Sequence, residues 1–238
     1  ALGETSVPAD QLECPEDEPD CDLEELVVLA KDSGAVYTYT PLDGDTQKVK
    51  APNTDSEDLF GRAVALSDDG TTLVVSALTE DSDLTGVYSE FIAENDNEDA
   101  PNAGAVYVYI RSSDEWVLQA YIKAPNTGQD DFFGWDVALS GDGSTLAISA
   151  IADDSAGSDP QDNSASNTGA VFVYTRSADV WVLQAYLKAS NAAENDSFGS
   201  ALAINQSGDY LAISALGEAG ISAKPEDNSA PLSGAVYI

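Results

Sequence analysis

From about residue 25 onward, short apolar runs alternate with clusters of glycine, serine, asparagine and aspartate. Four such runs stand at 105–110, 116–123, 135–140 and 145–150. In the first run, Val106 and Val108 lie on one face of an extended chain, and Tyr107 and Tyr109 lie on the other. The last two runs are joined by Gly141-Asp142-Gly143-Ser144, in which glycine supplies the positive φ of a tight hairpin. The pattern predicts a four-stranded antiparallel meander.

Both faces of the first predicted strand are apolar or aromatic, so the sheet needs cover on both sides. Small residues such as Ala147 and Ser149 fill the fourth run, whereas the second run carries Trp116 and Tyr121. This contrast predicts a wedge whose narrow inner edge is the fourth run and whose wide outer edge is the second. Radial stacking of such wedges gives a β-propeller. A linear β-solenoid and tandem β-sandwiches are the alternatives.

The same features return several times along the chain. Gly-Ala-Val-Tyr, or its Phe variant, begins at Gly34, Gly104, Gly169 and Gly234, at intervals of 70, 65 and 65 residues. Phe-Gly pairs recur at Phe60-Gly61, Phe133-Gly134 and Phe198-Gly199. Trp-Val-Leu-Gln-Ala-Tyr occurs twice, beginning at Trp116 and Trp181. So many markers in fixed phase indicate tandem copies of one structural unit.

A degenerate Gly-Ala-Pro-like box follows each Phe-Gly pair and precedes the next Gly-Ala-Val-Tyr. The boxes are Ser76-Ala77-Leu78, Ser149-Ala150-Ile151 and Ser214-Ala215-Leu216. This combination resembles the FG-GAP repeat, which builds the β-propeller of integrin α-subunits and occurs in many bacterial surface proteins. The resemblance covers roughly residues 25–238. It implies an all-β fold, a β-propeller of four-stranded antiparallel blades.

We expect an acidic N-terminal tail at 1–24 and propeller repeats at 25–238. The expected blade units are about 34–102, 103–167 and 168–232, and a further unit starts at 233–238. Leu26–Ala30 reads like Leu73–Ala77 and is expected to be the last strand of a preceding blade. Closed propellers have about 4 to 8 blades, whereas this chain holds about three and a half. We therefore expect a partial propeller that belongs to a longer chain, or else one that self-associates to close.

Charge and composition exclude several classes of function. The 238-residue chain has 43 acidic residues against 9 Lys plus Arg, a formal net charge of −34. Nucleic-acid binding needs clustered Lys and Arg, so we do not expect this protein to bind nucleic acid. The chain has no histidine, which removes imidazole triads. It also has no methionine and begins with Ala1, which indicates a processed or partial product. No apolar run reaches the roughly 18 residues that span a bilayer, so membrane insertion is not expected.

Two cysteines, Cys14 and Cys21, stand in the N-terminal tail with six residues between them. Two thiols without a histidine or a second cysteine pair make a poor zinc site, and the acidic residues between them raise a thiol pKa instead of activating it. We expect a small-loop disulfide, which indicates an oxidising compartment, extracellular or at the cell surface. The alternative is two unpaired thiols.

The family resemblance implies calcium, held by an Asp-x-Asp-x-Asp-Gly turn between the third and fourth strands. Only Asp69 and Asp142 stand at such positions here, so we expect plain hairpins. A candidate calcium site lies instead in the loop after the fourth strand of the second unit. Its ligands would be Asp153, Asp154, Asp159, Asp162 and Asn163, and the alternative is a solvated acidic loop.

Asp58, Asp131 and Asp196 each stand two residues before a repeated phenylalanine. Nothing acidic recurs at a fixed partner position, which argues against a recurring metal site. We expect these aspartates to cap the N–H groups of turns.

Loops of unequal length on a regular frame favour a recognition surface. We expect a non-enzymatic extracellular binding or adhesion module for a protein or glycan ligand, with calcium as a candidate cofactor. A structural subunit of a cell-surface fibre or matrix is the second hypothesis, and a propeller-fold enzyme is the third. No serine elbow, phosphate loop or haem motif appears, so neither nucleotide nor haem is expected. The carboxylate pairs lie in polar loops, with no apolar pocket evident to raise a pKa.

Overall fold

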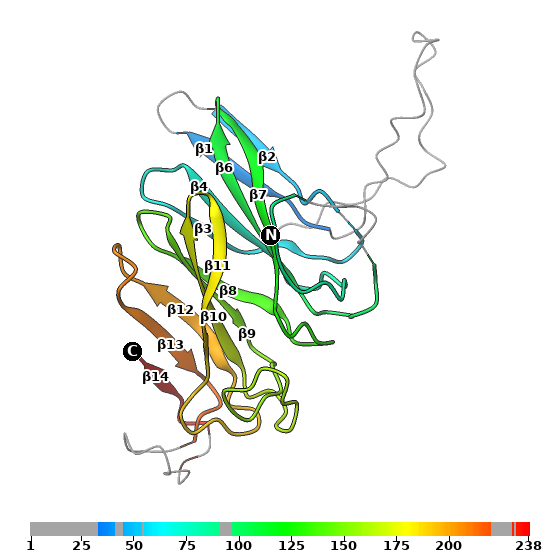
Figure 1. Ribbon diagram of the computed structural model, residues 1–238, viewed down its shortest axis with the longest axis vertical. Coiled ribbons are helices and arrows are strands. Elements are labelled where there is room, and N and C mark those ends of the chain that lie inside the picture. Colours follow the sequence, from blue (N-terminus) through cyan, green and yellow to red (C-terminus); the bar gives the residue numbers. More distant parts are fainter. Residues whose placement is uncertain (1–32, 41–44, 54, 91–96, 220–229, 231) are drawn as a thin grey trace.

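The computed structural model describes residues 33–40, 45–53, 55–90, 97–219, 230 and 232–238. These residues form fourteen strands and no helix (Figure 1). The strands are β1 (Val36–Thr40), β2 (Asp45–Val49), β3 (Phe60–Leu66), β4 (Thr72–Ala77), β5 (Gly86–Tyr88), β6 (Ala105–Ser112), β7 (Glu115–Lys123), β8 (Phe133–Leu139), β9 (Thr145–Ala150), β10 (Ala170–Ser177), β11 (Val180–Leu187), β12 (Phe198–Ile204), β13 (Leu211–Ala215) and β14 (Ala235–Tyr237). Nothing in this part of the chain is a helix long and apolar enough to cross a membrane.

The strands form antiparallel sheets that follow one another along the chain. The middle sheet has the order β11-β10-β9-β8 and is a complete four-stranded blade. The preceding sheet has the order β3-β4-β6-β7, with β5 added beside β7, and the following sheet has the order β12-β13-β14. β1 and β2 pair as a separate two-stranded sheet. Because β8 contacts both β3 and β12, the three larger sheets meet along their Phe-Gly strands (Figure 1). The fold is all-β, with the blades of a partial β-propeller.

Each observed blade begins at a Phe-Gly strand and continues through the next tryptophan strand. β4 pairs with β3 on one side and with β6 on the other, and β9 pairs likewise with β8 and β10. The expected meander of 105–110, 116–123, 135–140 and 145–150 is therefore wrong in its grouping, since its two halves belong to different sheets. The reason is that the long connection 78–104 stays within one sheet, whereas the shorter segment 124–132 passes to the next.

The inner edge of a blade was also predicted incorrectly. We expected the small-residue run to form it, but the Phe-Gly strands β3, β8 and β12 hold that position. β9 lies one place further out and is buried along nearly all its length. Its small side chains fit there because it has a hydrogen-bonded strand on each side and a neighbouring blade packed against the sheet. The tryptophan strand β11 forms the outer edge, as predicted.

The Phe-Gly and Gly-Ala-Val-Tyr motifs recur together because their aromatic rings meet inside each blade. The edge-on pairs are Phe60 with Tyr107, Phe133 with Phe172, and Phe198 with Tyr237, with ring centroids 5.5, 5.4 and 5.2 Å apart. All three phenylalanines are buried. Edge-on aromatic pairs contribute about 0.5–1.5 kcal/mol beyond the burial of their surface. The repeat therefore places one stabilising ring pair in each sheet.

The glycine of Gly-Ala-Val-Tyr joins successive blades. Gly104 has a φ of 81°, and a Cβ added there would lie 2.8 Å from the backbone nitrogen of Phe133. Next to it, the carbonyl of Ala103 accepts a hydrogen bond from that nitrogen at 2.9 Å. Both the positive φ and the close backbone contact exclude a side chain. Gly169 meets Phe198 in the same way at the next junction.

The serine of the degenerate box completes a β-bulge. The pairing of β3 with β4 shifts register between Phe60 and Val64, which leaves an N–H without its ladder partner. Ser76 Oγ accepts a hydrogen bond from the Ala63 N–H at 2.9 Å. Ser149 plays the same part between β8 and β9. A serine in place of the family's glycine thus satisfies the bulge.

Several predictions concern residues outside the described part of the chain. They are the acidic tail at 1–24, the disulfide between Cys14 and Cys21, and the strand at Leu26–Ala30.

Candidate functional site

A buried ion pair lies at one end of the sheet β3-β4-β6-β7, which is called the first complete sheet from here on. Lys123, the last residue of β7, places its Nζ 2.5 Å from Glu80 Oε2, and neither side chain is more than 3% exposed. Tyr121 OH and Asn53 Nδ2 both donate to Glu80 Oε1, at 2.6 and 3.2 Å. Burial lowers the pKa of Lys123, and the nearby Glu80 opposes that shift. Buried charges persist only when paired and hydrogen-bonded, so this cluster fixes the connection 78–104 to the outer strand.

The next blade repeats the arrangement with a shorter acid. Lys188 Nζ lies 3.0 Å from Asp153 Oδ1. Tyr186 OH donates to Oδ1 at 2.9 Å, and Asn126 Nδ2 donates to Oδ2 at 2.9 Å. Burial raises the pKa of Asp153, but Lys188 and the hydrogen bonds outweigh it and bring that pKa below its ordinary value. In the third blade, Glu218 accepts from an asparagine at the equivalent place, Asn191.

Apart from the length of the acid, the two lysine clusters differ at the aromatic residue beside the asparagine. In the first, Tyr107 OH donates to Asn53 Oδ1 at 2.6 Å. In the second, Phe172 stands where the repeat has that tyrosine. Asn126 Oδ1 is therefore buried without a hydrogen-bond partner in the part of the chain described.

Our reading of the sequence missed these clusters, although it contains a signal for them. Lys-Ala-Pro-Asn or Lys-Ala-Ser-Asn occurs at 50–53, 123–126 and 188–191, in phase with the repeat. An acidic residue follows three residues after the alanine of each box, at Glu80, Asp153 and Glu218. A recurring lysine in a chain with so few basic residues predicts a buried partner for that lysine.

The recurring aspartates before the Phe-Gly pairs cap turns, as predicted. Asp58 Oδ2 accepts from the Asp55 N–H at 2.9 Å, and Asp196 Oδ2 accepts from the Ala193 N–H at 2.7 Å. Asp131 forms the corresponding bond with the Gly128 backbone. Burial raises the pKa of Asp58 and of Asp131 to about 7.

The five predicted calcium ligands are not brought together. Asp153 lies in the ion pair with Lys188, and Asp154 accepts from the Asn167 N–H at 2.7 Å. Asp159 and Asp162 each accept from the backbone N–H two residues ahead, and Asn163 is exposed. No three acidic, cysteine or histidine side chains within the described ranges are grouped to hold a metal ion. Calcium binding stays a prediction, which a thermal melt in millimolar Ca²⁺ against NaCl of equal ionic strength tests.

The hairpin tips of three blades converge at the inner edge. Asp142 Oδ1 accepts from the Ser144 N–H at 2.9 Å, within the tight turn predicted at 141–144. The Asp68 N–H donates to the Gly141 carbonyl at 2.9 Å, and the Gly141 N–H donates to the Gln206 carbonyl at 3.0 Å. An open polar hollow of about 770 Å³ lies over these tips. Its lining has no aromatic side chain against which a ligand could pack.

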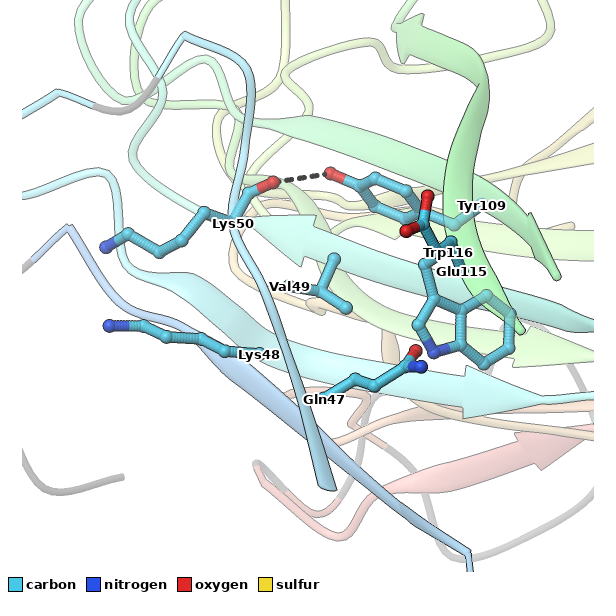
Figure 2. A pocket seen from close by; sticks show the side chains of 7 residues that line it. All are labelled: Gln47, Lys48, Val49, Lys50, Tyr109, Glu115 and Trp116. Carbon is cyan, nitrogen blue, oxygen red and sulfur yellow. Dashed lines mark hydrogen bonds between the residues drawn. The ribbon is translucent and has the colours of Figure 1, made fainter. Parts of the chain in front are cut away.

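A groove with an aromatic wall lies between β2 and the outer strands β6 and β7. It has a volume of about 460 Å³ and is lined by Gln47, Lys48, Val49, Lys50, Tyr109, Glu115 and Trp116. Figure 2 shows the Trp116 ring near Gln47 at one end and the lysine amines at the other. Tyr109 OH donates to the Lys50 carbonyl at 3.0 Å, and Trp116 Nε1 donates to Thr38 at 3.0 Å. Both rings are thus held in place before any ligand arrives.

The corresponding space beside the next tryptophan is filled. Trp181 Nε1 donates to Gln119 Oε1 at 3.0 Å, and Arg176 Nη1 donates to the same oxygen at 3.2 Å. Counting back four residues from the repeated lysine, Thr46 stands where Gln119 stands in the next copy. Trp116 Nε1 instead bonds to Thr38 on β1, and the groove beside its ring is open. The arginine paired across from Trp116, Arg111, has a buried Nε with no hydrogen-bond partner among the described side chains.

Comparison with protein families matches the model of the FG-GAP repeat to residues 44–89, 116–174 and 181–238. Comparison with curated proteins gives no match to this chain. The family matches cover more than half of the sequence and include the Phe-Gly strands β3, β8 and β12. Together with the antiparallel blades and the aromatic pairs that join the two motifs, they show that this chain belongs to the FG-GAP repeat family.

Proposed function

We propose that this protein is a non-enzymatic binding module of the cell surface, and that it binds a neutral glycan in the groove between β2 and β7. The observation that carries the proposal is the contrast between two equivalent positions. The space beside Trp181 is closed by Gln119 and Arg176, whereas the space beside Trp116 is open.

The groove offers the two kinds of contact that a sugar needs. The half-buried Trp116 presents ring surface to the apolar face of a pyranose, and its indole is already fixed by Thr38. Glu115 and Lys48 are exposed on either side and can bond to hydroxyl groups. A net charge of −34 disfavours a polyanionic glycan, so the proposed ligand is a neutral one.

The lining of the groove supports binding without hydrolysis. Glycosidases use two carboxyl groups on either side of the bond they cleave. Among the residues that line this groove, Glu115 is the one with a carboxylate. The buried carboxyl groups with raised pKa, Asp58, Asp131 and Glu218, are not part of the lining.

The experiment is a titration of the full chain with neutral oligosaccharides selected on a glycan array. Glu115→Ala is expected to weaken binding at least about tenfold, because a hydrogen bond to a charged group contributes about 1.5–3 kcal/mol. The matched control is Val180→Ala, at the same repeat position on the closed side. Val180 is 58% exposed, so that change is expected to leave affinity unaltered. Absence of binding to every neutral glycan, or equal weakening by both changes, would contradict the proposal.

A structural role in a surface fibre or matrix is the second candidate. It is favoured by apolar side chains that are exposed on sheet faces, namely Val64 and Leu66 on β3 and Val236 on β14, each at least 54% exposed. A fibre subunit self-associates through such faces, whereas a recognition module stays monomeric. Sedimentation velocity of the pure chain over a range of concentrations distinguishes the two roles.

A further inference from the structure

One carboxylate bridges an amine and a carboxamide in the interior of the first complete sheet. Glu80 Oε2 contacts Lys123 Nζ at 2.5 Å, and Oε1 accepts from Asn53 Nδ2 at 3.2 Å. Tyr107 OH donates at 2.6 Å to Oδ1 of the same carboxamide. Tyr107 and Lys123 are fully buried, and Glu80 and Asn53 are 2% and 7% exposed. The cluster thus holds a nucleophile, a proton acceptor, an acyl group and a donor to its oxygen.

We propose that Lys123 and Asn53 form an intramolecular amide bond, in which Glu80 transfers the protons and Tyr107 stabilises the carbonyl oxygen. The bond makes the first complete sheet a covalently closed unit. Asn53 precedes β3, the first strand of that sheet, and Lys123 ends β7.

The reaction needs no external reagent. Glu80 takes a proton from Lys123 Nζ, and the neutral amine attacks Cγ of Asn53 to form the new N–C bond. The electron pair of the carbonyl moves to Oδ1, where the Tyr107 hydroxyl stabilises the negative charge. Glu80 then protonates Nδ2, the Cγ–Nδ2 bond breaks and the carbonyl re-forms. The new amide nitrogen gives its second proton to the departing ammonia, which leaves as ammonium and so carries away both protons that the lysine lost.

The buried surroundings make this reaction faster than it would be between the same groups free in water. Burial lowers the pKa of Lys123, which brings the amine closer to its reactive neutral form. Burial raises the pKa of Tyr107 well above its ordinary value, so its hydroxyl stays protonated and can donate. Holding both reactants on one carboxylate also gives the reaction the advantage of a high effective concentration.

The second blade lacks one of the required groups. Lys188, Asp153 and Asn126 repeat the bridge, but Phe172 replaces the tyrosine, and no described residue donates to Asn126 Oδ1. A tetrahedral intermediate there would carry an unstabilised oxyanion. Removal of one oxyanion donor slows acyl transfer by about 10²–10³-fold. We therefore assign the bond to the first blade and not to the second.

The test is the intact mass of the purified, folded full chain after reduction of its cysteines and denaturation. The expected mass is lower than the sequence mass by one ammonia. A succinimide at an asparagine loses the same mass, so a tryptic map is needed. With the amide bond, trypsin does not cleave after Lys123, and a branched peptide joins the segments that contain Asn53 and Lys123. The full sequence mass, or normal cleavage after Lys123 with no branched peptide, would overturn the proposal.

Two variants test the assigned roles. Lys123→Arg keeps the buried positive charge but lacks the amine, so its mass is expected to equal the sequence mass. Tyr107→Phe keeps the ring and removes the donor, and formation of the bond in freshly refolded chain is expected to slow by at least about 10²-fold. An unchanged rate in Tyr107→Phe, or loss of a second ammonia from the second blade of the unaltered chain, would contradict the role of Tyr107.

Discussion

Asp153 shows how strongly one side chain depends on another in this fold. Its carboxylate accepts from Lys188, Tyr186, Ser155 and Asn126 and is 1% exposed. Four donors thus stabilise the buried carboxylate in its charged form. Taking away its charge would leave Lys188 buried without a counter-ion, which is the costly change at such a site.

Asp153→Asn is expected to lower the free energy of unfolding by about 3–5 kcal/mol. Urea denaturation at neutral pH measures the effect. Asp159→Asn is the matched control in the same loop, because Asp159 is exposed and accepts a single backbone hydrogen bond. Its effect is expected to stay below about 1 kcal/mol. Similar losses of unfolding free energy in the two variants would show that the ion pair stabilises the fold no more than an exposed aspartate does.

Asp58 and Asp131 predict how stability changes with pH. In the folded protein each has a pKa of about 7, raised by burial from 3.8. Between these values the folded state binds more protons than the unfolded state. The stabilising contribution is therefore present at low pH and is lost as pH rises towards 7. Each group changes the free energy of unfolding by at most about 1.4 kcal/mol per pH unit.

The double variant Asp58→Asn/Asp131→Asn isolates this effect from the repulsion among the other acidic residues. Urea denaturation is measured for both proteins at about pH 5 and about pH 8. Unaltered protein is expected to lose more stability between the two values than the variant, whose amides keep an acceptor for the turn. An equal pH dependence in the two proteins would show that these carboxyl groups titrate normally.

The strand β8 requires glycine at its second residue. Gly134 has a φ of 90°, and a Cβ there would lie 2.8 Å from the Ser76 side chain of the neighbouring blade. Gly134→Ala is expected to cost about 2–4 kcal/mol, from backbone strain together with the clash. Gly70→Ala is the control, because Gly70 also has a positive φ but its Cβ would meet nothing within 4 Å. Its cost is expected to be about 1 kcal/mol. Thermal or urea melts that rank the two variants equally would contradict close packing of the blades.

The existence of most strands could be predicted from the sequence, but their grouping into sheets could not. Alternation at 105–110 and the glycine turn at 141–144 are local signals, and the structure has β6 and the β8–β9 hairpin there. A tandem repeat looks the same whichever strand is taken as first. Only the pairing of β4 with β6 across the long connection 78–104 fixes where a blade begins.

The polar site was missed for a related reason. Asp153 and Lys188 are 35 residues apart in sequence, and in isolation Asp153 belongs to an acidic loop. Its partner becomes visible only when the lysine is seen to recur in phase with the box. The aromatic groove reflects a departure from the repeat, since Thr38 accepts from the Trp116 indole whereas Gln119 accepts from the Trp181 indole. The effect of such a departure can be judged only when the packing of the neighbouring blade is known.

The charge of the whole molecule predicts a response to salt. A net charge of −34 on 238 residues destabilises the compact state by self-repulsion. Raising NaCl from about 10 mM to about 500 mM shortens the range of that repulsion and is expected to raise the melting temperature. Differential scanning calorimetry measures the change. A melting temperature that falls with added salt would show that the surface ion pairs outweigh the repulsion.

The central claim is that the chain is a rigid array of blades that recognises its ligand beside Trp116. The most direct measurement follows the indole N–H resonances of the three tryptophans, Trp116, Trp135 and Trp181, as a neutral oligosaccharide is added. Of the three indoles, that of Trp116 lines the open groove, so its resonance is predicted to shift and saturate as the oligosaccharide binds. The Trp181 indole is bonded to Gln119, and its resonance is predicted not to move. A bound oligosaccharide that left the Trp116 resonance unmoved, or that moved Trp181 instead, would contradict the account.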